Sequence, residues 1–220
     1  MKAMILAAGR GERLRPLTDK IPKPLIKIAG KSLIEYHIEH LATAGYKDIV
    51  INTAWLAEKI HAQLGDGAQY GVSISYSDEG TALETAGGII NALPLLGKGS
   101  FLVVNGDIWC DYNFSKLPGL NPGIQAHLVL VDNPGHNPEG DFALQDGLIR
   151  NSNDTLYTFS GIGIYTVDFF AEQSPGAFPL APIIRNKCEK NLVSGQYHNG
   201  LWADAGTIER LHDLEKQLTG

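Results

Sequence analysis

The stretch MILAAGRGERLRPLTDKIPKPL, residues 4–25, decides how this chain folds and what it holds. An apolar run over residues 3–8 predicts a buried strand that ends at Gly9. Glycine and arginine then alternate, and Lys23 follows between two prolines whose rings restrict its backbone. Amides of a glycine turn and arginine side chains both bind anions. The stretch therefore predicts a phosphate-holding loop at the end of the first strand.

Two familiar nucleotide-binding loops do not fit this stretch. The dinucleotide fingerprint G-x-G-x-x-G needs a glycine where the chain has Leu14, and Pro16 interrupts the helix that should follow. The Walker loop needs Gly-Lys-Ser/Thr, which does not occur here. A plain turn would explain the glycines but not the basic residues around them, which are Arg10, Arg13, Arg15, Lys20, Lys23 and Lys27. A compact polyphosphate is the ligand that this loop favours.

Strands and helices alternate along the first half of the chain. The apolar pattern predicts buried strands at residues 3–8, 47–52, 72–76 and 101–107, and helices at 32–45, 55–65 and 84–96. Later strands are expected at 125–131 and 155–165, and later helices at 180–190 and 207–218. This alternation predicts an α/β fold, a single Rossmann-like three-layer domain over residues 1–220 with a mostly parallel mixed central sheet.

Composition excludes several classes of partner. The net charge of −6 argues against a nucleic-acid binder, which needs a positive face, and the longest early apolar run is too short to cross a membrane. Cys110 and Cys188 have no metal-ligand spacing in the sequence, so two reduced, buried thiols in a cytoplasmic protein are expected. No segment typical of assembly is recognisable, which favours a monomer.

The pattern L-A-A-G-x-G-x-R-x-x-P-L-T from Leu6 to Thr18, followed by P-K-P-L at residues 22–25, resembles the signature of sugar-1-phosphate nucleotidyltransferases. The resemblance implies the nucleotide-diphospho-sugar transferase fold, with a nucleotide-binding half over about residues 1–110 and a sugar-binding half over about 111–220. It also implies that Arg13 assists the departure of pyrophosphate and that Lys23 contacts the reacting phosphate. The loop's nucleotide-binding residues would be Ala8, Gly9, Gly11, Glu12, Arg13 and Lys23.

A second segment, SDEGTALETAGGI at residues 77–89, resembles the element of this family that faces the nucleobase and sugar. Glu84 stands where glycine is more usual in that element, which puts the backbone contacts of residues 81–85 in question. The segment opens a helix whose first amides are free to meet a ligand. Its expected nucleotide contacts are Thr81, Thr85 and Gly87, and Tyr76 at the end of the preceding strand could face the base.

Two aspartates complete the resemblance. Asp107 ends the fourth strand in N-G-D, and Asp204 lies in W-A-D-A-G-T. Taken alone, each would be a turn residue or a helix cap, but the resemblance implies that both bind magnesium. Mg²⁺ accepts one or two carboxylates together with phosphate oxygens and water, so two aspartates suffice. The implied cofactor is Mg²⁺, and the implied catalytic residues are Arg13, Lys23 and Asp107.

The sugar contacts implied by the resemblance come from the second half of the chain. Gly140 lies in a G-D-F turn, and Ser160 lies in an S-G-I-G-I-Y strand. The resemblance also implies that Asn105 faces the sugar side of the metal. An acidic position falls on Asn153 or Asp154, between which spacing does not choose, and Asp154 is taken as the sugar-binding candidate.

The chain most resembles the short bacterial uridylyltransferases that act on N-acetylmuramic acid α-1-phosphate in cell-wall recycling, which implies UTP and a sugar 1-phosphate as substrates. A mannose- or glucose-1-phosphate nucleotidyltransferase would share every motif. Two alternatives of other kinds stay open. A nucleotide-sugar sensor need not keep both aspartates, and a choline-phosphate enzyme would need an aromatic cage, for which the chain offers Trp55, Trp109 and Trp202.

Overall fold

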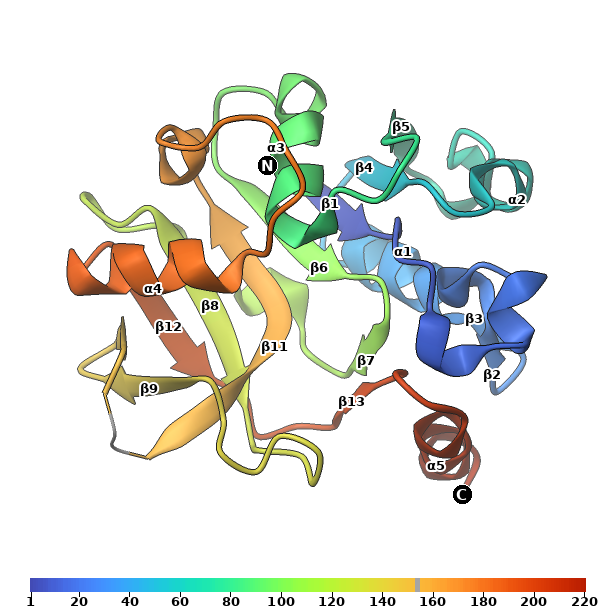
Figure 1. The fold of residues 1–220 in the computed structure, drawn as a ribbon. Helices are drawn as coiled ribbons and strands as arrows, with labels where there is room; N and C mark the ends of the chain where they lie inside the picture. Colours follow the sequence, from blue (N-terminus) through green and yellow to red (C-terminus); the bar gives the residue numbers. More distant parts are fainter. Residues whose placement is uncertain (153–154) are drawn as a thin grey trace.

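The apolar run at the start of the chain forms β1 (Lys2–Leu6) near the middle of a nine-stranded sheet (Figure 1). This is a computed structural model, and it describes residues 1–152 and 155–220. β1 pairs in parallel with β4 (Asp48–Thr53) and β6 (Phe101–Asn105), and β5 (Ser73–Asp78) pairs in parallel with β4. The four expected parallel strands are confirmed. Because β4 and β6 lie on opposite sides of β1, a crevice opens beyond its carboxyl end, where open α/β sheets bind ligands.

The second half of the chain extends the same sheet. β11 (Leu156–Tyr165) pairs antiparallel with β6 and so joins the two halves. Beyond it lie, in order, β8 (Ala126–Val131), β12 (Val193–Tyr197), β10 (Leu148–Arg150) and β9 (Phe142–Gln145). Only β12 and β8 pair in parallel among these neighbours, so the sheet is mixed, as expected. Sequence analysis missed β9, β10 and β12, because they are short and lie among turn-forming residues.

Helices cover both faces of the sheet. Alternate residues of β1 show this: Ala3 and Ile5 pack in one apolar cluster with α1 (Leu33–Thr43) and α2 (Ala57–Leu64). Met4 points the other way and packs with α3 (Glu84–Leu96) and α4 (Ala181–Glu189). The three-layer arrangement is therefore confirmed. The capping box expected at the start of α1 also forms, with the Ser32 amide donating to the Glu35 carboxylate at 3.0 Å.

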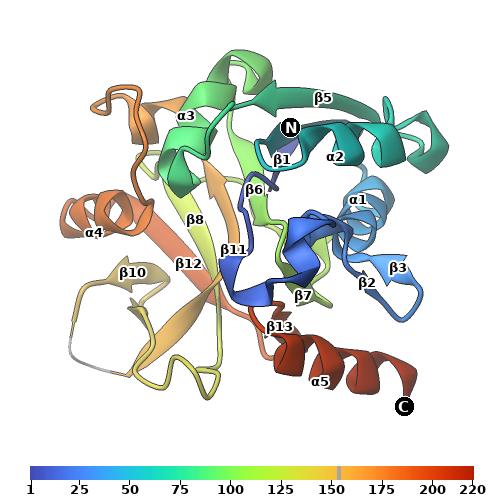
Figure 2. The ribbon, with the colours of Figure 1, turned by 45° about the vertical axis from the view of Figure 1, so that its right-hand side comes forward.

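The opening loop and the C-terminal segment meet beside the crevice. The opening loop forms 3₁₀ turns at Glu12–Leu14, Leu17–Asp19 and Lys23–Leu25, then a hairpin of β2 (Lys27–Ile28) and β3 (Lys31–Ser32). A short ladder of β7 (Ile108–Cys110) and β13 (Trp202–Asp204) leads to α5 (Ile208–Thr219), which lies beside the opening loop (Figure 2). A small apolar cluster holds this corner together and contains Leu14, Ile26, Ile28, Leu33, Trp109, Ala205, Leu211 and Leu214. Further 3₁₀ turns span Ala68–Tyr70, Phe114–Lys116 and Val167–Phe170.

The structure also bears on the two cysteines and on membrane-spanning helices. Both cysteines are free and buried, and burial raises the pKa of Cys110 to about 12 and that of Cys188 to about 11. In the described ranges, no helix has the length and apolar content needed to span a bilayer.

Candidate active site

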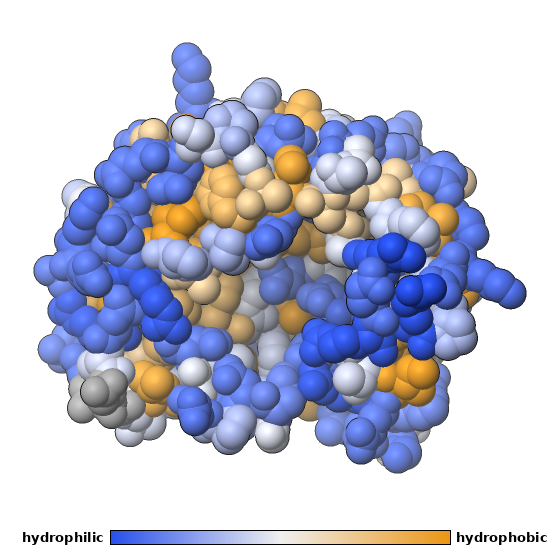
Figure 3. Space-filling model, in the orientation of Figure 1, coloured by the Kyte–Doolittle hydropathy of each residue, from blue (hydrophilic) through white to orange (hydrophobic). Residues whose placement is uncertain are grey.

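A cleft of about 220 Å³ lies beyond the carboxyl ends of β1, β4 and β6. Figure 3 shows a hollow in the middle of this face, with strongly hydrophilic residues gathered beside it where Figure 1 places the opening loop. The cleft is built from four segments distant in sequence, and its lining residues are Leu6, Ala7, Ala8, Gly9, Lys23, Pro24, Asn52, Ala82, Glu84, Thr85, Asn105 and Asp107. The opening loop and the N-G-D segment, which sequence analysis singled out, therefore share one cavity.

The opening loop is held in shape by its own residues. Gly11 adopts a left-handed conformation with φ of 70°, and its carbonyl accepts a hydrogen bond from the buried Thr18 hydroxyl at 2.8 Å. A Cβ at this position would lie 2.9 Å from the Thr18 Cγ2 and 3.3 Å from the Lys23 Cβ. Only glycine suits both the backbone angle and the close contact. Thr18 and Gly11 thus set the wall against which Lys23 is packed.

Lys23 forms the central ion pair of the cleft. Its Nζ lies 2.5 Å from Oδ2 of Asp107, and the side chain of Lys23 is 9% exposed whereas that of Asp107 is 42% exposed. The turn between β6 and β7, which carries Asp107, is held close to the end of β1, because Gly106 donates its amide to the Leu6 carbonyl and a Cβ on Gly106 would lie 2.5 Å from that oxygen. A buried cation and a carboxylate that reaches solvent therefore face the cavity together.

A hydrogen-bond chain fixes the wall opposite the opening loop. Asn52, at the end of β4, accepts the Ala7 amide at 2.8 Å and donates to Glu79 at 2.6 Å. Glu79 in turn accepts the Leu83 amide at 2.8 Å. Gly88 leaves room for this pair, since a Cβ there would lie 2.5 Å from the Glu79 carboxylate. Asn52 and Glu79 were not predicted from the sequence, because Ala7, Asn52 and Glu79 are far apart in the chain and no motif links them.

Glu84 occupies a position that favours glycine. Its φ is 58°, in the left-handed region, and it lines the cleft beside Thr85. A residue with a Cβ loses about 1–2 kcal/mol in this conformation. The family resemblance had marked this residue as replacing a usual glycine, and the backbone explains why glycine suits the site. Glu84, which departs from the family pattern, is therefore a residue with a strained backbone in the lining of the cleft.

The expected nucleotide contacts that lie outside the cleft lining are Gly11, Glu12 and Arg13 in the opening loop, and Tyr76, Thr81 and Gly87 beyond it. Tyr76 points to the α2 side of the sheet, where its ring packs on His61 at 4.0 Å and its hydroxyl donates to the Gly65 carbonyl. Strand alternation explains this orientation, because Ile74 and Tyr76 share the face that α1 and α2 cover. Gly87 donates its amide to the Phe178 carbonyl, so this amide is not free as expected. Thr81 is exposed and does not line the cavity.

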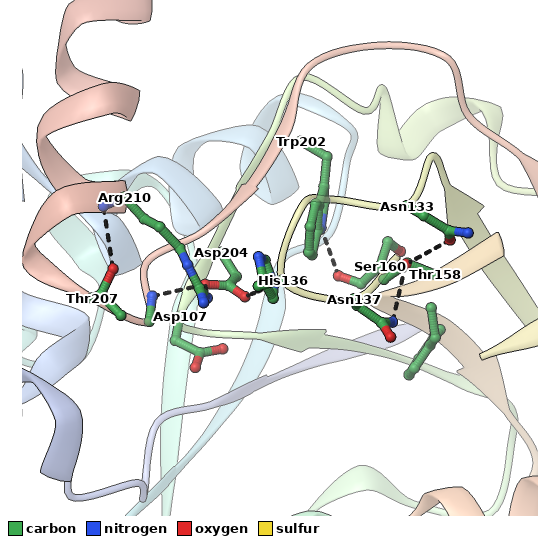
Figure 4. Close-up of polar contacts among 12 residues, drawn as sticks. Asp107, Asn133, His136, Asn137, Thr158, Ser160, Trp202, Asp204, Thr207 and Arg210 are labelled. Atoms are coloured by element: carbon green, nitrogen blue, oxygen red, sulfur yellow. Dashed lines mark hydrogen bonds and ion pairs between the residues drawn. The ribbon is translucent and has the colours of Figure 1, made fainter. Parts of the chain in front are cut away.

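Asp204 lies at the end of β13 between two basic side chains (Figure 4). Its Oδ1 accepts hydrogen bonds from the Gly206 amide at 2.9 Å and from Arg210, and its Oδ2 lies 2.7 Å from the His136 Nε2. Burial pushes the pKa of Asp204 upward, but the hydrogen bonds from Arg210 and Gly206 and the charge of the two side chains lower it below its usual value. Asp204 is therefore an anion held by three donors.

The β7–β13 ladder brings the two candidate metal ligands to one place. Ala205, next to Asp204, donates its amide to the Asp107 carbonyl at 2.8 Å, and the two carboxylates lie near one another in Figure 4. Arg13 lies beside the same segment, since a Cβ on Gly206 would lie 3.1 Å from the Nη2 atom of Arg13. The opening loop and the W-A-D-A-G-T segment are thus neighbours. The structure brings Arg13, Asp107 and Asp204 together, as the resemblance implied.

These carboxylates fit a magnesium ion by their donor chemistry. Asp107 uses Oδ2 for Lys23, and among the described residues its Oδ1 has no partner. Asp204 uses both lone pairs of Oδ1 but only one of Oδ2, so one acceptor position remains. Two monodentate carboxylates beside a phosphate-binding loop are the ligand set that Mg²⁺ accepts. The assignment of the ion itself stays a prediction.

Other residues of the loop are placed at its rim. Arg10 stacks over the Trp55 ring at 4.4 Å and pairs with Glu12 at 3.2 Å, and both charged side chains are exposed. The Trp55 indole donates to the Thr18 carbonyl at 2.8 Å, which anchors the loop to the segment that follows β4. Ala8 and Gly9 line the cleft directly. Glu12 lies outside that lining, at the mouth of the loop.

The sugar-binding candidates are only partly brought together. Asn105 lines the cleft and packs on Gly161 of β11. A Cβ on Gly161 would lie 2.6 Å from the side-chain amide nitrogen of Asn105. Gly140 has φ of 73° and packs against Asn133 and Leu156. Ser160 is fully buried, and its hydroxyl donates to the Val129 carbonyl at 2.7 Å, so a contact at this point would have to come from neighbouring backbone. Asn153 and Asp154 lie outside the described residues.

The fold and the cleft define a phosphate-handling enzyme of the α/β class, and comparison with known proteins agrees. The profile of the family described as nucleotidyl transferase matches residues 2–142. The chain belongs to this nucleotidyl transferase family.

Particular relatives extend the match to the whole chain. The chain is 53% identical to the N-acetylmuramate alpha-1-phosphate uridylyltransferase of Neisseria meningitidis serogroup B, over 98% of this chain and 97% of that protein. It is 33% identical to the protein of the same name from Caulobacter vibrioides, over 98% and 96%. Among solved structures, HddC from Yersinia pseudotuberculosis complexed with GMP-PN superposes with a TM-score of 0.80 at 20% identity, covering 99% of each chain. At that identity the likeness supports the fold alone.

Proposed function

We propose that this protein transfers the uridylyl group of UTP to N-acetylmuramic acid α-1-phosphate and releases pyrophosphate. The observation that carries the proposal is the 53% identity, over nearly the full length of both chains, with the Neisseria enzyme named for this activity. The cleft supplies an anion-binding loop, a buried lysine and the Asp107 carboxylate, and the Ala205–Asp107 backbone hydrogen bond places Asp204 next to it. With UTP as donor, we place the reaction in the cytoplasm, as a step of cell-wall recycling.

The chemistry is a direct in-line displacement. A phosphate oxygen of the sugar 1-phosphate forms a bond to the α-phosphorus of UTP, and the bond from that phosphorus to the bridging oxygen of the β-phosphate breaks. Pyrophosphate leaves with the electron pair of the broken bond. Catalysis of this kind consists of positioning the reactants and neutralising charge, without a covalent intermediate on the protein.

The cleft residues have distinct parts in this reaction. Gly9 and Gly11 shape the loop around the triphosphate, and Lys23 offsets charge at the attacked phosphate. Arg13 steadies the departing pyrophosphate from the side of the cleft near Gly206. Asp107 and Asp204 would hold Mg²⁺, which when bound would neutralise phosphate charge.

Pyrophosphate release over a matrix of nucleotides and sugar phosphates tests the proposal. We expect release with UTP and N-acetylmuramic acid α-1-phosphate, and much less with GTP and mannose 1-phosphate or with UTP and glucose 1-phosphate. The variant Asp107→Asn keeps the side-chain volume and should lose turnover by at least about 100-fold with an unchanged fold. Full activity of that variant, or no release by the wild type with the first pair, would refute the proposal.

The structure also speaks against the choline-phosphate alternative. The three tryptophans lie at different places, with Trp55 beside Arg10, Trp109 beside Tyr36, and Trp202 hydrogen-bonded to the Ser160 carbonyl. Trp109 and Trp202 belong to different apolar clusters. They therefore form no aromatic cage in the described part of the chain. If the protein were a sensor without turnover, it would bind UTP tightly and release no pyrophosphate. The same assay therefore distinguishes a sensor from an enzyme.

A further inference from the structure

His136 reaches the candidate metal carboxylate from a loop that lies far from Asp204 in the sequence. It lies in the loop that connects β8 to β9, and its Nε2 is 2.7 Å from Oδ2 of Asp204 on β13 (Figure 4). A carboxylate is only an acceptor when ionised, so the imidazole must donate its Nε2–H. The low pKa of Asp204 keeps that carboxylate ionised. No motif of the sequence pointed to this contact.

The loop that carries His136 is braced on both sides of the histidine. Asn133 accepts the Thr158 hydroxyl at 2.9 Å and donates to the Leu156 carbonyl at 3.0 Å. Asn137 donates to the same Thr158 hydroxyl at 3.1 Å. Thr158 belongs to β11 and is buried, so both asparagines tie the loop to the central sheet (Figure 4). The imidazole is therefore held at Asp204 by the fold, and its position does not depend on a loose loop.

The hydrogen bonds to Asp204 leave one acceptor position open. Oδ1 has two donors, Gly206 and Arg210, and so both of its lone pairs are used. Oδ2 has one donor, His136, and keeps a second lone pair. A cation can therefore bind Asp204 through Oδ2 alone while all three donors stay in place. Such outer donors orient a ligating carboxylate and hold it ready for the ion.

We propose that His136 is a positioning residue that orients Oδ2 of Asp204 toward the divalent ion. This inference rests on the proposed function, because it needs Asp204 as a ligand. The histidine makes no contact with substrate in this proposal, and its effect passes through the carboxylate. Loss of such an outer partner typically weakens metal affinity by about 10–100-fold. His136→Ala should therefore weaken the binding of the ion, and His136→Gln should restore most of it because the amide still donates.

Binding of Mn²⁺ gives a readout that is independent of turnover. The ion is titrated into protein saturated with α,β-methylene UTP, whose α–β bridge cannot be cleaved, and free Mn²⁺ is followed by electron paramagnetic resonance. The nucleotide without protein provides the background. The matched control is His61→Ala, which removes a histidine whose Nε2 lies 3.3 Å from an aspartate, Asp78, outside the cleft lining. The Mg²⁺ concentration for half-maximal pyrophosphate release is measured in parallel.

We expect His136→Ala to bind Mn²⁺ at least about tenfold more weakly, while His61→Ala matches the wild type. At saturating Mg²⁺, the turnover number of His136→Ala should approach that of the wild type. Equal or tighter Mn²⁺ binding by His136→Ala would overturn the inference, because the histidine would then be a bystander or a competitor for Oδ2. If Asp107→Asn loses the ion but His136→Ala does not, the inference fails and the proposed function stands. If the wild type binds no ion, both metal assignments fail.

Discussion

Gly11→Ala probes the geometry of the opening loop. Gly11 has φ of 70°, where a residue with a Cβ loses about 1–2 kcal/mol. The added Cβ would also lie 2.9 Å from the Thr18 Cγ2 and 3.3 Å from the Lys23 Cβ. Overpacking of this kind costs about 1–3 kcal/mol. The unfolded chain loses freedom at the same time, which returns about 0.4–1 kcal/mol. The expected net loss of stability is therefore about 3 kcal/mol.

For a chain of this size, 1 kcal/mol corresponds to about 2–4 °C in Tm, so Gly11→Ala should melt about 6–12 °C lower. The matched control is Gly9→Ala, because a Cβ on Gly9 meets no described atom within 4 Å. Its Tm should stay within about 2 °C of the wild type, while KM for UTP rises because Gly9 lines the cleft. Thermal melts followed by circular dichroism check both variants. Equal melting temperatures for the two variants would refute the reasoning about Gly11.

Three further variants test other features of the structure. Lys23→Met should lower kcat/KM for pyrophosphate release by at least about 100-fold, and Lys23→Arg should not restore it, because a guanidinium does not fit the packed site. Glu84→Gly should raise the free energy of unfolding in urea by about 1 kcal/mol, since it relieves a left-handed residue; an unchanged value would remove the claim of strain. Burial lowers the pKa of His37 to about 4 from 6.5, so between these pH values the unfolded chain binds a proton that the folded chain does not. Stability should therefore fall by up to about 3 kcal/mol as the pH drops from 6.5 to 4, and His37→Gln should lack this part of the loss.

Local patterns predicted most of the architecture. The parallel strands β1, β4, β5 and β6 and the five α-helices appear where the apolar periodicity placed them, because burial on one or two faces leaves a direct mark on residue order. The short strands β9, β10 and β12 left no such mark. They are held by neighbouring strands, and their few apolar residues do not outweigh the turn-forming residues around them.

The residues of the candidate site also fall into those that the sequence predicted and those that it did not. Residue types alone predicted the loop from Gly9 to Lys23, and the family resemblance added Asp107 and Asp204, because the phosphate-binding loop is continuous in the chain and each aspartate lies in a short motif. The orientation of Tyr76 toward α2 could not be predicted in this way. It depends on which face of β5 the helices cover, and strand alternation then turns the ring away from the cleft.

The sequence by itself determined the fold class and the loop that we propose to bind phosphate, because both depend on residues that are neighbours in the chain. Only the tertiary structure decided which side chains complete the site. Lys23 meets Asp107 across 84 positions, and His136 meets Asp204 because a loop braced on β11 ends beside the β7–β13 ladder. Contacts of this range arise from how strands are ordered in the sheet, and that order is not written in any local pattern of residues.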